Sequence, residues 1–171
     1  MSLRRLLVSV DKQFEGREGR VMAKKAPKNE KASQSKAGPT TPLVSVPLVL
    51  WQQEPDNHDY PAAESYLSLV TNAAQAKKLV EQLKKAPLVM HPAKDVLRSA
   101  QLQLLPMNDA AVLKDITKVA QGTKLSPVLL VRGNYTTNVP LVIADGYHRV
   151  CSSYHLSENE LIPCRIIDGT I

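Results

Sequence analysis

The sequence predicts a mixed α/β (α+β) fold in which a mixed β-sheet is flanked by helices. From residue 87 onward, short aliphatic runs typical of buried strands are interleaved with amphipathic segments of helical period. Of the 171 residues, 43% are hydrophobic but only 4% are aromatic, so the core must consist mainly of Leu, Val, Ile and Ala. Turn and capping residues separate these runs, which indicates one domain with appendages.

The N-terminal segment, residues 1–41, has the composition of a disordered basic tail. It contains ten Lys and Arg residues and four acids, an excess that equals the net charge of +6 of the whole chain. It is rich in Lys, Ser, Ala and Pro and has no periodic apolar face. We therefore expect a solvated tail that can make weak, non-specific contacts with nucleic acid, attached to a neutral folded part.

Residues 42–86 are expected to form an extended segment and a helical hairpin. Pro47 interrupts the β-rich run 43–51, which favours an edge strand or an extended arm. Pro61 fits the first turn of one helix, and Asn72 can cap a second helix. The second helix has one apolar stripe, formed by Ala76, Leu79, Val80 and Leu83.

Residues 87–171 read as the sheet-containing domain. Strands are expected at 88–91, 94–99, 126–133, 139–144 and 162–167. One helix should run from a cap at Asn108 to a stop at Gly122. A second helix should cover 147–156, directly after the strand that ends near Ala144.

Four chemically active residues crowd the corner between this last strand and helix: Asp145, Gly146, His148 and Arg149. A helix N-terminus has unpaired backbone N–H groups and a partial positive charge, which favour a bound anion. Gly146 permits a sharp turn and a close approach of a ligand. Arg149 offers a planar fork for phosphate oxygens, and His148 adds a further donor. Asp145 would then hold a metal ion or accept a proton.

The same part of the sequence is also compatible with a capping role, a zinc site or a nucleophilic cysteine. Asp145 can simply cap the helix, with His148 and Arg149 as surface residues of its first turn. Zinc accepts ligands such as His148, Cys151, His155 and Cys164, but no CxxC motif accompanies them. Cys151 can also be a nucleophile, although its place inside the helix favours a packing role. We expect no metal site formed by these cysteines and histidines.

The stretch from Lys94 to Ile167 resembles the ParB/sulfiredoxin superfamily. The resemblance rests on "SPVLLVRG", on Gly146-Tyr147-His148-Arg149 at the strand-to-helix corner and on the closing "IPCRII". In sulfiredoxins this corner holds ATP, and in ParB proteins it holds CTP. The resemblance implies that Gly146, His148 and Arg149 bind a nucleotide of the ATP or CTP class, with magnesium, and that Thr117 lies near it.

The sequence also departs from both groups. Tyr147 stands where sulfiredoxins have their nucleophilic cysteine, so sulfinic-acid reduction is not expected. These 171 residues contain no helix-turn-helix of the ParB type. The corner also resembles that of free-serine kinases built on this fold. This similarity implies that Asp145 acts as a base or holds magnesium in nucleotide hydrolysis or phosphoryl transfer. The alternative function is that of a DNA-associated accessory protein, without its own helix-turn-helix.

The chain is expected to be cytoplasmic and to have no membrane partner. No apolar run approaches the roughly 20 residues that a membrane-spanning helix requires. Its two cysteines fit a reducing compartment, in which a disulfide is not expected.

Overall fold

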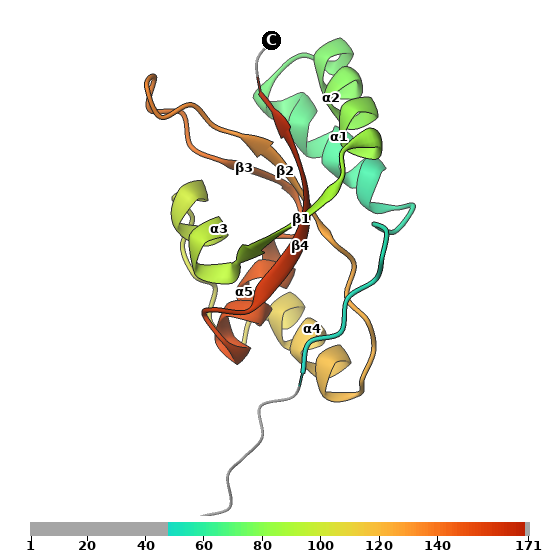
Figure 1. The fold of residues 1–171 in the computed structure, drawn as a ribbon, viewed down its shortest axis with the longest axis vertical. Coiled ribbons are helices and arrows are strands. Elements are labelled where there is room, and N and C mark those ends of the chain that lie inside the picture. Colours follow the sequence, from blue (N-terminus) through green and yellow to red (C-terminus); the bar gives the residue numbers. More distant parts are fainter. Residues whose placement is uncertain (1–47, 170–171) are drawn as a thin grey trace, which may run out of the picture. The chain divides into compact units, whose positions relative to one another are not determined.

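The computed structural model describes residues 48–169, which contain five helices and one four-stranded sheet (Figure 1). In chain order the elements are α1 (Asp59–Val70), α2 (Ala73–Lys85), β1 (Leu88–Pro92), α3 (Ala93–Ala100), α4 (Ala110–Ala120), β2 (Val128–Arg132), β3 (Val142–Asp145), α5 (Tyr147–Leu156) and β4 (Leu161–Asp168). The predicted basic tail and residues 42–47 lie outside the described residues. The α+β class is confirmed.

The sheet is mixed, as the sequence predicts. Its strand order is β1-β4-β2-β3, with β2 parallel to β4 and antiparallel to β3, and with β1 antiparallel to β4. The central strand β2 is aliphatic and buried from Val128 to Val131. A strand buried on both faces is expected to be continuously apolar rather than alternating.

Helices cover both faces of this sheet (Figure 1). Val128 and Leu130 of β2 pack into a core with α3 and α5, whereas Leu129 and Val131 pack into a second core with α1 and α2. This alternation follows from the two-residue period of a strand. The helix α4 lies outside the sheet and packs mainly on α5.

The helical hairpin of α1 and α2 is present, and its second helix is built as the sequence predicts. Oδ1 of Asn72 accepts a hydrogen bond from the backbone N–H of Gln75 at 2.9 Å and so caps α2. The apolar stripe of α2 is buried throughout. The first helix begins at Asp59, two residues before Pro61.

Two expected features are wrong in detail. Residues 94–99 are not a strand but most of α3, because Ala93, Val96, Leu97 and Ala100 repeat with helical spacing and are all buried. The cap of α4 is Asp109 rather than Asn108, since Oδ1 of Asp109 accepts from the N–H groups of Ala111 and Val112 at 3.0 and 3.1 Å.

The described part of the extended segment runs along the loop that precedes β2. The backbone of Leu50 and Gln52 exchanges hydrogen bonds of 2.8 Å with Leu125, and Trp51 forms an isolated bridge there. The segment is therefore an arm rather than a strand of the main sheet. Among the described residues, none of the helices is both long and apolar enough to cross a membrane.

Candidate functional site

The strand β3 passes into α5 through a glycine in the left-handed conformation. Gly146 is the N-cap residue, with φ 102° and ψ 17°. A Cβ at this position would lie 2.9 Å from Cγ2 of Val128 and 3.0 Å from Nη2 of Arg149. Residues with a side chain rarely adopt such a φ. Gly146 is therefore required both for the turn and for the close approach of Arg149 to the backbone.

The guanidinium of Arg149 is paired inside the protein. Its side chain is 14% exposed, its Nη2 donates to the carboxylate of Asp145, and its Nη1 lies 3.3 Å from Oδ1 of Asp59. The carbonyl oxygen of Pro127 accepts a longer bond of 3.5 Å. The Nε atom is buried and has no hydrogen-bond partner among residues 48–169. Two carboxylates thus share one guanidinium, and one donor is unused.

Asp59 is a residue of this cluster that the sequence analysis did not identify. It is the first residue of α1 and is only 1% exposed. Its Oδ2 accepts hydrogen bonds from the Ser126 hydroxyl and from the backbone N–H of Asp56. An acid in the first turn of a helix is ordinary, because it complements the helix dipole. Only its contact with Arg149, 90 positions away, distinguishes it.

Asp145 is the carboxylate of this group that lies nearest the solvent. Its side chain is 21% exposed, against 2% for Asp59. Burial raises the pKa of Asp145, Arg149 lowers it and Asp59 raises it again, so that the net effect is an increase. The ionised form of Asp145 is thus less well stabilised than in water. Asp145 does not cap α5; Gly146 is the cap residue and makes no side-chain cap bond.

His148 is exposed in the first turn of α5. Its ring is tilted against that of Tyr147, with the centroids 5.7 Å apart. The Tyr147 hydroxyl donates to the carbonyl oxygen of Gln103, in the loop before α4. Tyr147 therefore holds this loop beside the start of α5, and His148 remains accessible to a ligand.

The remaining predicted site residue, Thr117, belongs to α4. It is exposed on α4, and its hydroxyl donates to the carbonyl oxygen of Leu113 at 2.8 Å. The shallow hollow that Thr117 lines is formed entirely by residues of α4 and its C-terminal cap. The hollow contains none of the corner residues, so the structure brings together Asp145, Gly146, His148 and Arg149 without showing Thr117 beside them.

The two cysteines are packing residues. Cys151 and Cys164 are fully buried, and both belong to the core between the sheet, α3 and α5. Burial raises the pKa of Cys151, and it raises that of Cys164 to about 12. His155 is engaged with the carbonyl oxygen of Leu105 at 2.7 Å. The burial of both thiols and the engagement of His155 argue against a zinc site formed with exposed His148 and against a nucleophilic role for Cys151.

Among residues 48–169, one group of side chains that could hold a metal ion shares Asp59 with the ion pairs of Arg149. Asp56, His58 and Asp59 each place a ligand atom within 4.8 Å of the others. Both oxygens of Asp59 already have partners, namely Arg149 and His58 on one side and Ser126 with Asp56 on the other. A cation here would have to replace these contacts. Magnesium prefers oxygen ligands, which Asp59 and Asp145 can supply.

Comparisons with known proteins give no match: no family profile, curated protein or solved structure is significantly similar to this chain. The resemblance to the ParB/sulfiredoxin superfamily stays a prediction from the sequence. The corner residues must consequently be judged by their own geometry.

Proposed function

We propose that the chain is a phosphate-binding protein of ParB/sulfiredoxin-like type, and that its ligand is a nucleotide of the ATP or CTP class bound at the N-terminus of α5. The observation that carries this proposal is the position of the Arg149 guanidinium. Its Nη2 and Nε atoms would lie 3.0 and 3.1 Å from a Cβ at residue 146, directly beside the start of the helix. The guanidinium thus lies beside the N-terminus of α5, where unpaired backbone N–H groups favour an anion.

The unused donor of Arg149 supports the same conclusion. Buried N–H groups almost always have a partner, and one without a partner costs about 1–3 kcal/mol. The Nε atom lacks an acceptor among residues 48–169, on the edge of the guanidinium that adjoins Gly146. A phosphate oxygen supplies such an acceptor, and exposed His148 can donate to a second oxygen.

Asp145 has to give up its contact with Arg149 when a phosphate binds. Its raised pKa and its partial exposure fit a carboxylate that can exchange partners. Once released, its oxygens are free to hold magnesium or to accept a proton from a substrate hydroxyl. Whether the chain turns over its nucleotide, by hydrolysis or by phosphoryl transfer, depends on this carboxylate.

A thermal-shift series tests nucleotide binding. ATP, ADP, CTP and GTP are added with and without magnesium, and the midpoint of each variant is compared with its own ligand-free value. We expect at least one nucleotide to raise the unfolding midpoint of the wild type. Arg149→Lys should retain part of this increase. His148→Ala should reduce the increase less than removal of the Arg149 guanidinium does. The matched control is Arg98→Lys on α3, whose side chain is 82% exposed. The proposal is abandoned if no nucleotide stabilises the wild type.

Turnover is tested separately with Asp145→Asn. Loss of magnesium-dependent turnover, with nucleotide binding retained, assigns Asp145 to the metal or to proton transfer. Unchanged turnover excludes both roles.

The alternative function, contact with DNA, rests on the positive charge of residues 1–41, which lie outside the described residues. A salt series separates the two functions. Binding through lysines weakens steeply as salt increases and disappears from a chain that begins at Thr41, whereas nucleotide binding at α5 survives that truncation.

A further inference from the structure

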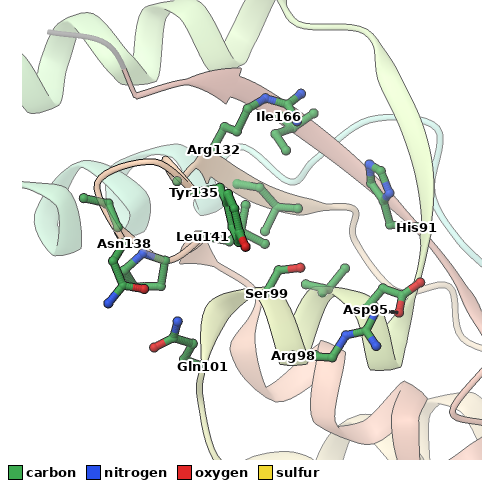
Figure 2. A pocket seen from close by; sticks show the side chains of 15 residues that line it. His91, Asp95, Arg98, Ser99, Gln101, Arg132, Tyr135, Asn138, Leu141 and Ile166 are labelled. Atoms are coloured by element: carbon green, nitrogen blue, oxygen red, sulfur yellow. Dashed lines mark hydrogen bonds and ion pairs between the residues drawn. The ribbon is translucent and has the colours of Figure 1, made fainter. Parts of the chain in front are cut away.

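A pocket of about 380 Å³ lies between α3 and the loop that joins β2 to β3 (Figure 2). Its size is within the range of about 300–1,000 Å³ that is usual for small-molecule sites. Its floor is aliphatic, formed by Val96, Leu130, Leu141 and Ile166, and its rim carries polar side chains from α3, β1 and the loop. An apolar floor with a few polar groups at the opening is the usual composition of a ligand site.

The walls of this pocket are fixed by the fold. The backbone N–H of Leu141 donates to the carbonyl oxygen of Ser99 at 2.9 Å, which ties the loop to the last turn of α3. Asn134 and Val139 exchange bonds of 2.8 and 2.9 Å and close the loop on itself. Gly133 permits this closure, since a Cβ there would lie 2.2 Å from the carbonyl oxygen of Val139. The pocket is thus formed by backbone contacts of the fold and exists before a ligand binds.

The charged lining favours an anion. Arg98 and Arg132 contribute two guanidinium groups, and Asp95 is the one acidic residue among the lining residues. In the view of Figure 2 the two arginines lie on opposite sides of the opening. Arg98 pairs with Asp95 at 3.0 Å and Arg132 with Asp168 at 2.9 Å, and the arginine side chains are 82% and 59% exposed. Exposed ion pairs contribute little to the free energy of folding. Either guanidinium can therefore exchange its carboxylate partner for a ligand.

An aromatic side chain at the mouth completes the site. Tyr135 lines the pocket but its ring is fully exposed, so it makes little contact with the rest of the protein. Figure 2 shows Tyr135 on the loop, among the residues that line the pocket. A flat apolar ligand seated on the aliphatic floor would stack against Tyr135 and cover it.

We propose that this pocket binds a small carboxylate that has an aromatic or apolar body. A carboxylate matches the fork of a guanidinium and accepts two bonds from it. A singly charged carboxylate is preferred to a doubly charged phosphate, because Arg98, Ser99 and Gln101 belong to the C-terminal end of α3, where the helix carries a partial negative charge. The body of the ligand fills the aliphatic floor.

This site is separate from the corner at α5. Val128, at one end of β2, touches the space beside Gly146, and Arg132, at the other end, lines the pocket. Four strand steps of about 3.3 Å place the two ends roughly 13 Å apart. Binding of a carboxylate in this pocket can consequently be tested independently of nucleotide binding at α5.

The experiment is a titration of the full-length, isotope-labelled protein with phenylacetate, followed by amide chemical shifts. We expect saturable shifts at Ser99, Arg132 and Leu141 and none at Gly146. The uncharged analogue phenylacetamide should bind about tenfold more weakly, because it keeps the ring and loses the charge-assisted bonds. Equal binding of the acid and the amide, or shifts centred on Gly146, would overturn the proposal.

Variants then assign the contacts. We expect Arg132→Gln to weaken phenylacetate binding about tenfold and Arg98→Gln or Tyr135→Ala to weaken it several-fold, all three residues being exposed and thus dispensable for folding. The matched control is Lys78→Gln, which removes one positive charge from an exposed position of α2, on the opposite face of the sheet. A loss as large in Lys78→Gln as in Arg132→Gln rejects the site. So does tighter binding of phenyl phosphate in this pocket, which would replace the carboxylate by a phosphate ligand.

Discussion

Arg149 of α5 and Asp59 of α1 form a nearly buried ion pair, with Nη1 and Oδ1 3.3 Å apart, between residues 90 positions apart in the chain. The pair joins the hairpin on one face of the sheet to the helix on the other. Asp145, at the end of β3, completes it from the edge of the sheet. Arg149, which we propose as a phosphate ligand, therefore also holds three elements together.

The first prediction concerns the stability that this pair supplies. Arg149→Met should lower the free energy of unfolding by about 3–5 kcal/mol, because it leaves the buried carboxylate of Asp59 without a cation. Adding Asp59→Asn should recover part of this loss, since the unpaired charge is then gone. Urea denaturation measures both variants.

Arg98→Met is the control for this measurement. Its pair with Asp95 is exposed, so the change should stay within about 0.5 kcal/mol. Equal losses of unfolding free energy in Arg149→Met and Arg98→Met would mean that the buried pair stabilises the fold no more than an exposed pair does. Because Arg149 variants are expected to be less stable, nucleotide effects on them must be measured against their own ligand-free state.

The second prediction compares two glycines that share a positive φ. Gly122→Ala should cost about 1 kcal/mol, since φ is 71° and a Cβ there has no neighbour within 4 Å among the described residues. Gly146→Ala should cost about 2–4 kcal/mol, because the added methyl group also displaces Arg149 and contacts Val128. The difference between the variants, measured by thermal unfolding, isolates the crowding at the corner. Equal costs would show that Arg149 moves aside freely.

Local chemistry explains which elements could be predicted from the sequence. The stripe of α2, its Asn72 cap and the aliphatic strand β2 are decided by residues close to one another in the chain. α5 has the predicted bounds, Tyr147 to Leu156, because Gly146 marks its start. By contrast, residues 94–99 contain only two apolar residues, Val96 and Leu97, and only the longer spacing from Ala93 to Ala100 reveals the helix α3.

The candidate site was predictable only in part, for a related reason. Asp145, Gly146, His148 and Arg149 are adjacent in the sequence, so their crowding at one corner follows from a strand that turns into a helix. The second carboxylate partner of Arg149, Asp59, does not follow from the sequence. Asp59 and Ser126 reach the corner through the packing of α1 and of the segment before β2, which no local pattern encodes.

The third prediction uses the buried thiols. Because burial raises the pKa of Cys151 and raises that of Cys164 to about 12, hardly any thiolate is present at pH 8 in the native protein. Native protein should therefore react slowly with a thiol reagent, and both cysteines should react rapidly in guanidinium chloride. A fast native reaction would contradict the packing role, as would stoichiometric zinc in the purified protein. Cys151→Ala should cost about 1 kcal/mol and leave nucleotide stabilisation intact.

The last prediction concerns pH and Asp145. Its pKa is raised above the ordinary value of 3.8, because burial and the neighbouring Asp59 outweigh the attraction of Arg149. The folded protein consequently binds this proton more tightly than the unfolded chain does, because its pKa for Asp145 is the higher of the two. The contribution of Asp145 to the free energy of unfolding is largest when it is protonated, and it is lost as the pH rises through the folded pKa.

Asp145→Asn removes this titration and retains an oxygen that accepts a bond from Arg149. The free energy of unfolding of Asp145→Asn, relative to the wild type, should therefore increase as the pH is raised from 3.8 through the folded pKa of Asp145. Urea denaturation of both proteins at a series of pH values and constant ionic strength measures this difference. Stability curves of the two proteins that run parallel over the whole pH range would show that Asp145 has the same pKa in the folded and unfolded states. The ionised carboxylate would then be as well stabilised in the folded protein as in water, and this support for its exchange of partners at the corner would be removed.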